Sequence, residues 1–265
     1  MDALASIARD SALFLDAVRA ARPDSRVPAC PEWGAADLTY HLAEVQDFWS
    51  AVVGPAEGRG LDGDDVRTLR RPDDDAALPT LAAEATARLL AALAGRDPHE
   101  PCWSWHDAGR TVGWVRRRQA HEALVHRVDA EQTAGRDVTS ADPEVAADGV
   151  DEILRVLVDG IPEWATFTPD GSTISVAVDG PGETPRSWEL AFGRLAGTGP
   201  ESGTAYDLDS AQLVDLPGST SAQVSGAAWD LDLWLWGRGE RDGLVVRGDA
   251  ALADRLRAVA VQETQ

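Results

Sequence analysis

The sequence predicts an α+β protein of two domains, a four-helix bundle over residues 1–138 followed by a smaller mixed α/β domain over residues 139–265. Two observations lead to this fold class. Apolar residues recur every three to four positions through the first part of the chain, the period of amphipathic helices. Beyond Asp137 apolar and polar residues begin to alternate, as in half-buried strands. With 265 residues, 44% of them hydrophobic, the chain can bury a core in each domain.

Four amphipathic stretches predict the helices of the first domain. They cover residues 2–21, 38–52, 81–93 and 111–134. The first helix should end before Pro23, and Gly34 with Asp37 is suited to begin the second. Gly95 and Gly135 are expected to end the third and fourth helices. Residues 54–80 lack a period and are rich in Gly, Asp, Arg and Pro, which predicts a long charged loop.

The second domain is expected to mix helices and strands. Helical stretches are predicted at residues 145–158, 225–236 and 250–261, and strands at residues 174–178, 188–192 and 244–246. Gly and Pro residues separate these stretches, as turns require.

The charge and the termini narrow the classes of function. A formal net charge of -21, from 45 acidic and 24 basic residues, argues against binding to nucleic acid or to an anionic membrane. No apolar run of 18 residues and no signal peptide is apparent, so a cytoplasmic protein is expected. Cys30 and Cys102 are interpreted as small buried residues with reduced thiols, although the sequence leaves a single bridge open.

The strongest chemical pattern lies in the fourth predicted helix. Glu122 and His126 are four residues apart and therefore project from one face, which they share with Arg118 and Asp129. His41 lies within the apolar stripe of the second helix and can face them in a bundle. Two imidazoles and one carboxylate are a ligand set for zinc that leaves a fourth position open.

Simpler interpretations of the same histidines exist. His41 can be a hydrogen-bonded core histidine, and Glu122 with His126 can be a solvated pair on a helix surface. His121 points about 100° away from the pair, so it should face solvent or a neighbouring helix. His99 and His106 lie in a linker and are expected to have no chemical role, although His106 can line the mouth of a pocket.

Several motifs together resemble one known family. Residues 27–33, Val-Pro-Ala-Cys-Pro-Glu-Trp, precede Asp37 and His41, and Glu122-x-x-x-His126-Arg127-x-Asp129 follows later. These motifs, with residues 147–152 and 224–238, resemble the mycothiol-dependent maleylpyruvate isomerase family. Its N-terminal bundle is related to the DinB-like metalloenzymes, and its members are numerous in actinobacteria. The likeness spans nearly the whole chain.

The resemblance implies a zinc site made by His41, Glu122 and His126, with mycothiol as thiol cosubstrate. In such an isomerase the thiol adds to a cis double bond, rotation follows, and elimination releases the trans product. Asp129 is expected to orient a metal ligand. Arg238 is the preferred residue for binding an anionic substrate, ahead of Arg67, Arg70 and Arg71 in the long loop, although structural salt bridges are an alternative role for each.

The sequence therefore predicts a zinc-dependent, mycothiol-using isomerase or S-transferase that acts on a small electrophilic substrate. The alternative is a non-catalytic regulatory or binding protein that keeps the bundle. A monomer or homodimer is expected, with mycothiol and a small molecule as partners. Fold and ligand set do not identify the substrate.

Overall fold

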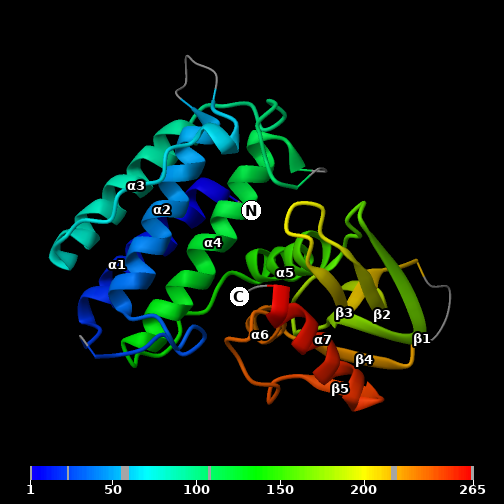
Figure 1. Ribbon diagram of the computed structural model, residues 1–265. Helices are drawn as coiled ribbons and strands as arrows, with labels where there is room; N and C mark the ends of the chain where they lie inside the picture. The colour runs from blue at the N-terminus through cyan, green and yellow to red at the C-terminus, as the bar shows by residue number, and fades with distance from the viewer. Residues whose placement is uncertain (1, 23, 55–59, 107–108, 216–219, 264–265) are drawn as a thin grey trace. The chain divides into compact units, whose positions relative to one another are not determined.

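The chain divides into two compact units, Met1–Thr139 and Ser140–Gln265, in a computed structural model (Figure 1). The structure describes residues 2–22, 24–54, 60–106, 109–215 and 220–263. Within these residues the first unit is helical and the second combines helices with a five-stranded sheet. The predicted α+β fold with a helical N-terminal domain is confirmed.

Four long helices build the N-terminal unit. They are α1 (Ala3–Ala20), α2 (Ala35–Val53), α3 (Leu78–Leu93) and α4 (Val112–Thr133). Helix α1 packs along α4 and α2 packs along α3, while α2 also contacts α4 (Figure 1). Buried apolar residues from all four helices form one core cluster, which includes Ile7, Trp49, Leu89 and Val115. This packing brings the face of α4 that carries Glu122 against α2.

Capping hydrogen bonds mark the beginnings of α2 and α4, the two helices that carry the predicted metal ligands. The Gly34 N–H donates to the Asp37 carboxylate over 2.9 Å at the start of α2. The Trp114 N–H donates to the Thr111 hydroxyl over 3.2 Å at the start of α4. Gly135 follows the end of α4 with φ at +67°, a conformation that glycine adopts without strain.

The predicted long loop is only partly irregular. Its residues 55–59 lie outside the described residues, and α3 begins at Leu78 rather than at the predicted residue 81. Two 3₁₀ turns, Gly63–Asp65 and Asp75–Ala77, interrupt the rest. Arg71 of the loop forms an ion pair of 2.7 Å with Asp37 of α2.

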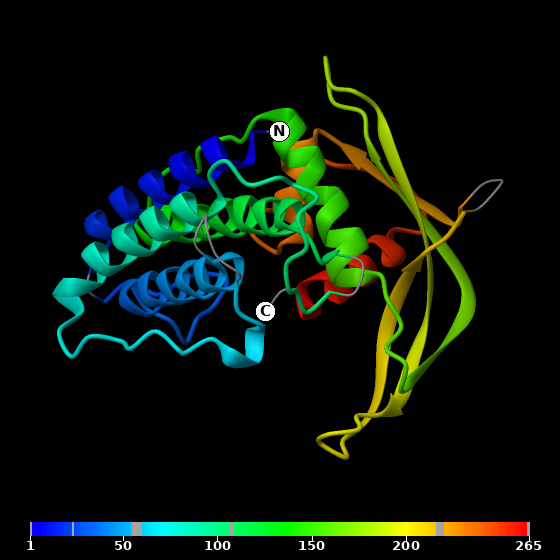
Figure 2. The same ribbon diagram turned by 90° about the horizontal axis from the view of Figure 1, so that it is seen from above.

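The C-terminal unit is a mixed sheet with helices against it. Its helices are α5 (Pro143–Glu152), which continues as a π-helical segment over Ile153–Val158, α6 (Ala228–Leu235) and α7 (Ala250–Glu263). Its strands are β1 (Ala165–Val178), β2 (Arg186–Thr198), β3 (Ala205–Leu213), β4 (Ala222–Gly226) and β5 (Val245–Gly248). The strand order is β3-β2-β1-β4-β5; β1 and β4 run parallel and the other neighbours antiparallel. The sheet curves around α7 (Figure 2).

Alternating burial accounts for the two strands predicted from period two. In β1 the side chains of Ile174, Val176 and Val178 are buried, and in β2 those of Trp188, Leu190 and Phe192. The residues between them are less buried, as expected for one covered face.

One prediction for this unit was wrong, and the strands β3 and β4 were missed. Ser225 and Gly226, assigned to the start of a helix, belong to β4, because Ser225 pairs with Ala177 of β1 and with Val245 of β5. Helix α6 starts only at Ala228. Strand β3 was not predicted; it pairs along β2 from Leu190 to Thr198.

One stretch of the N-terminal unit, Asp75–Leu93, is long and apolar enough to cross a membrane by length and composition alone. Helices in the core of a globular protein often have the same length and composition. Leu78, Ala85 and Leu89 of this stretch are buried within the unit.

Candidate metal centre

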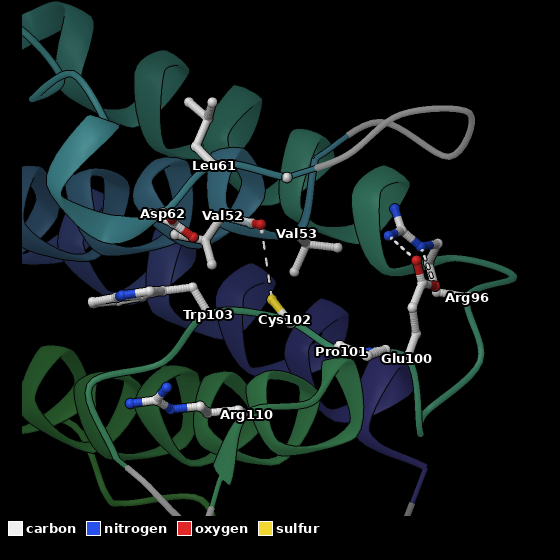
Figure 3. A pocket seen from close by; sticks show the side chains of 11 residues that line it. Val52, Val53, Leu61, Asp62, Arg96, Glu100, Pro101, Cys102, Trp103 and Arg110 are labelled. Carbon is white, nitrogen blue, oxygen red and sulfur yellow. Dashed lines mark hydrogen bonds and ion pairs between the residues drawn. The ribbon is translucent and has the colours of Figure 1, made fainter.

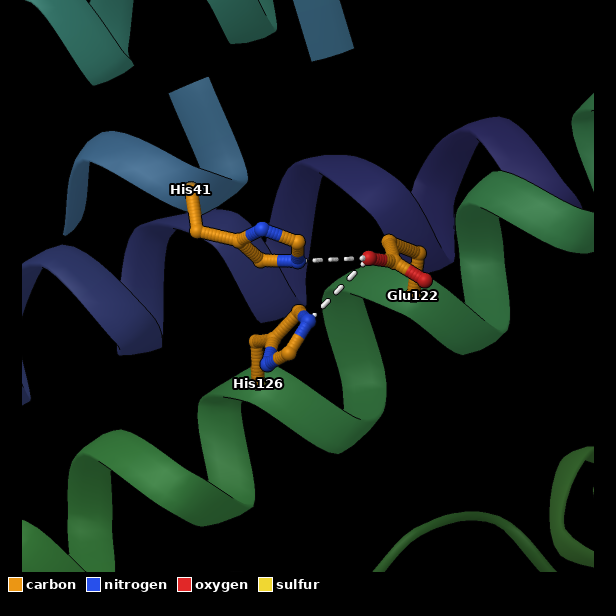
Figure 4. A group of neighbouring side chains, drawn as sticks. All are labelled: His41, Glu122 and His126. Carbon is orange, nitrogen blue, oxygen red and sulfur yellow. Dashed lines mark hydrogen bonds and ion pairs between the residues drawn. The ribbon is translucent and has the colours of Figure 1, made fainter. Parts of the chain in front are cut away.

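Three potential metal ligands meet between α2 and α4. Glu122 Oε1 lies 3.4 Å from His41 Nε2 and 3.1 Å from His126 Nε2, so both imidazoles point the same nitrogen at one carboxylate oxygen (Figure 4). Helix α4 supplies Glu122 and His126 from successive turns, and α2 supplies His41 across the helix interface. One ligand atom from each residue lies within 4.8 Å of the other two. We call these three residues the triad.

The ligand atoms of the triad suit a transition-metal ion. Zinc lies about 2.0–2.2 Å from nitrogen and oxygen ligands, which separates two ligands of a tetrahedral site by roughly 3.3–3.6 Å. The two distances from Glu122 Oε1 are close to that separation. Small side-chain movements would therefore bring all three atoms onto one ion, and three protein ligands leave a further position free.

Asp129 fixes the orientation of His126. Its Oδ2 lies 3.0 Å from His126 Nδ1, and the carboxylate is fully buried. This contact holds a proton on Nδ1 and leaves Nε2 facing Glu122 Oε1. A carboxylate behind a metal-binding histidine is a recurrent arrangement that fixes the tautomer and makes the ligand more basic.

His41 has a different neighbour. Its ring lies 4.9 Å from the ring of Trp33, and 4.8 Å from the ring of His126 in an edge-on arrangement. The His41 side chain is 31% exposed, against 9% for His126. The accessible side of the triad is therefore at His41. Trp33 was missed as part of the site, although it belongs to the motif quoted for the family.

The electrostatics of the triad favour an ionised carboxylate. Burial raises the pKa of Glu122, but the charge and hydrogen bond of His126, the hydrogen bond of His41 and the charge of Arg118 outweigh it and hold the pKa well below its usual range. Burial lowers the pKa of His126, but the charge of Glu122 and the hydrogen bond to Asp129 raise it to about 9. Before a metal binds, the pair thus exists as carboxylate and imidazolium at neutral pH.

The remaining histidines lie elsewhere. His121 was expected to face either solvent or a neighbouring helix. It is 1% exposed, so the solvent-facing alternative was wrong. His106 stacks on Trp114 with ring centroids 6.1 Å apart. His99 lies in a turn of the connection between α3 and α4, where its N–H donates to Asp97.

Arg238, the predicted substrate-binding residue, belongs to the C-terminal unit. It is 7% exposed, donates to the Trp236 carbonyl over 2.6 Å, and has its guanidinium carbon 5.8 Å from the centroid of the Trp236 ring. Its role toward a substrate stays a prediction. In the loop of the first unit, Arg70 pairs with Asp73 and Arg71 pairs with Asp37 and Asp75. These pairs fit the alternative of structural salt bridges.

A cavity of about 360 Å³ lies apart from the triad in the N-terminal unit (Figure 3). Arg96 and Glu100 on its wall pair with each other over 2.5 Å. The Cys102 thiol faces the Val52 carbonyl, and burial raises the pKa of this thiol to about 11. A neutral thiol is a poor nucleophile, so Cys102 is not suited to react in this cavity. Cys30 and Cys102 are both of intermediate exposure, rather than fully buried as expected.

The fold and the triad define a class: a helical unit with a His-Glu-His cluster between two helices, followed by an α+β unit. Comparison with family models identifies it more closely. Residues 4–131 match the mycothiol maleylpyruvate isomerase N-terminal domain, and residues 144–255 match the C-terminal domain of the same proteins. The chain belongs to the mycothiol-dependent maleylpyruvate isomerase family, as predicted.

Solved structures agree on the fold. The chain is similar to the mycothiol-dependent maleylpyruvate isomerase, with 15% sequence identity and a TM-score of 0.55 over 94% of this chain and 93% of that one. A histidine-to-alanine mutant of that isomerase is similar at 14% identity, with the same TM-score and coverage. A comparison with curated protein sequences gives no match. Membership of a family named for an isomerase supports the prediction of an enzyme.

Proposed function

We propose that this protein is a zinc-dependent enzyme that uses mycothiol to isomerise a small electrophilic substrate or to transfer the thiol to it. The observation that carries the proposal is the convergence of His41, Glu122 and His126 on one point between α2 and α4. The family match supports mycothiol as the thiol cosubstrate, since mycothiol is named in both the family and the similar solved structures.

Each residue of the site has a distinct part in the proposal. The Nε2 atoms of His41 and His126 and Oε1 of Glu122 hold the ion, and Asp129 keeps His126 in the tautomer that presents Nε2. Zinc in such a site favours the thiolate form of a bound thiol near neutral pH, and the thiolate is the nucleophile. The thiol is proposed to approach from the side of His41, because the His41 side chain is 31% exposed.

Arg238 is proposed to bind the anionic group of the substrate. A guanidinium recognises a carboxylate through two parallel hydrogen bonds, which a lysine cannot reproduce. Under this proposal Arg238→Lys raises KM for a carboxylate substrate more than it lowers kcat. A role confined to packing against Trp236 predicts lower thermal stability with KM unchanged.

Metal analysis tests the proposal first. Protein purified without a histidine tag should contain about one zinc per chain, and His126→Ala should lose it. His99→Ala is the matched control, because His99 lies in the connection between α3 and α4 and outside the triad. Metal that is stoichiometric and unchanged in His126→Ala contradicts the ligand set.

Thiol binding and turnover test the second part. Isothermal titration with mycothiol should show binding to the zinc-loaded protein and weaker binding to the metal-free protein. Conversion of maleylpyruvate to its trans isomer then distinguishes isomerase from S-transferase activity. Zinc without thiol binding or turnover supports instead the non-catalytic binding protein. We propose a cytoplasmic location, in keeping with the need for a reduced thiol.

A further inference from the structure

The two oxygens of the Glu122 carboxylate have separate partners. Oε1 faces His41 Nε2 and His126 Nε2, while Oε2 lies 3.0 Å from Nη2 of Arg118. Arg118 is one turn before Glu122 on α4, so both side chains project from the same face of the helix. The Arg118 side chain is 7% exposed and that of Glu122 is 16% exposed. The pair is thus well shielded from water.

This division matters because a carboxylate can bind a metal through one oxygen or through both. A guanidinium keeps its charge at any physiological pH and donates in a fixed plane. An oxygen that accepts a charge-assisted hydrogen bond from it is held away from the ion. The two histidine nitrogens and a single oxygen make three ligands, whereas a second oxygen would take the position that the incoming thiol needs.

We propose that Arg118 is a positioning residue that restricts Glu122 to binding the metal through Oε1 alone and so preserves the coordination position for the thiol. The inference rests on the proposed metal site. It gives Arg118 a role in thiol binding without any contact between Arg118 and the thiol. It also explains why α4 places the Arg118 guanidinium, a cation, next to a site that binds a metal cation.

Cobalt substitution provides the test, because the visible absorption of Co²⁺ reports its coordination number and a bound thiolate adds a charge-transfer band. Co²⁺-loaded wild type should show the intense bands of a four-coordinate ion and should bind 2-mercaptoethanol. Arg118→Met, which removes the donor, should give the weaker bands of a higher coordination number and bind the thiol about ten- to a hundredfold less tightly. Arg118→Gln keeps one donor and should stay closer to wild type.

Arg116→Met is the matched control. Arg116 is on the same helix but donates to the carbonyls of Leu93 and Arg96, away from the triad. Its loss should lower thermal stability while the cobalt spectrum and thiol binding stay unchanged. Identical spectra and thiol affinities for wild type, Arg118→Met and Arg118→Gln would overturn the inference.

A crystal structure of the cobalt-loaded wild type decides the matter if Arg118→Met does not fold. The inference expects Oε1 on the ion and Oε2 on Arg118. Both oxygens of Glu122 bound to the ion would refute it. Failure of the proposed metal site looks different, since wild type would then bind no cobalt at all.

Discussion

At the scale of the residue, helix α4 is notable for the charged side chains that it buries. Counted as whole residues, Arg118, His126, Arg127, Asp129 and Glu131 are each at most 7% exposed. An unpaired buried charge is very costly, so each of them has to be paired. They separate into the group around the triad and a second group around Arg127. The second group has a structural role.

Arg127 joins three parts of the N-terminal unit. Its Nε lies 3.0 Å from Asp10 on α1, and its Nη1 lies 2.8 Å from Glu131 and 2.6 Å from the Thr139 carbonyl. We expect Arg127→Met to destabilise the protein by about 3–5 kcal/mol, because it leaves the buried Glu131 carboxylate without this cation and leaves the buried Asp10 paired with the partly exposed Arg9. Chemical denaturation measures this. Arg136→Met, which removes an exposed pair with Asp16, should cost at most about 1 kcal/mol.

The metal-free protein should lose stability as the pH rises above neutrality. The pKa of His126 in the folded state, about 9, exceeds the unfolded value of about 6.5. Its ion pair therefore stabilises the fold fully below pH ~6.5 and is lost as the pH passes through about 9, a loss of about 3 kcal/mol. Thermal unfolding in chelator from pH 6.5 to 9.5 measures the decline. An equal decline in His126→Gln would show that other groups cause it.

At the scale of the element, α4 matters most because it supplies two of the three proposed ligands. Thr111 caps its start by accepting from the Trp114 N–H, and Gly135 allows its end. Between them the helix runs unbroken from Val112 to Thr133, which keeps Glu122 and His126 one turn apart. The spacing of the ligands thus depends on the regularity of a single helix.

Removal of the cap of α4 should have a small, defined cost. We expect Thr111→Ala to lower the free energy of unfolding by about 1 kcal/mol, since it leaves a backbone N–H at the helix start without its partner. Thr111→Ser keeps the hydroxyl and should be close to wild type in denaturant titrations. Equal losses in the two variants would indicate that the Thr111 methyl group, rather than its hydrogen bond, supports the helix.

At the scale of the whole molecule, the chain divides into two compact units. The proposed metal ligands all belong to the first unit, Met1–Thr139. The second unit, Ser140–Gln265, carries Arg238 and the sheet. Metal binding and the folding of the sheet are therefore expected to be largely independent.

Metal should stabilise the first unit selectively. Zinc at a hundredfold excess over its Kd stabilises the folded form by about 2.7 kcal/mol. Hydrogen exchange followed by mass spectrometry should show slower exchange in α2 and α4 around His41, Glu122 and His126 when zinc is added. Exchange in β1 and β2 should stay the same. An equal slowing in those strands would mean that the two units unfold together.

The sequence by itself determined the helices, the two long strands and the family. Periods of 3.6 and two residues are local properties, and the spacing of Glu122 and His126 follows from one helix. The motifs around His41 and Glu122 then predicted the family that the comparisons support. Sequence was weaker for β3 and β4. The short β4 carries Ser225 and Gly226, and its parallel pairing with β1 depends on a partner some 50 residues away.

Only the tertiary structure decided how the charged residues are partnered. Helical spacing put Arg118, Glu122, His126 and Asp129 in one sector, but it could not assign Glu122 Oε2 to Arg118 or His126 Nδ1 to Asp129. Nor could it bring His41, 81 positions away in the chain, to 3.4 Å from Glu122 Oε1. Such contacts depend on how α2 packs on α4 and on which rotamers that packing allows, and neither has a local signature.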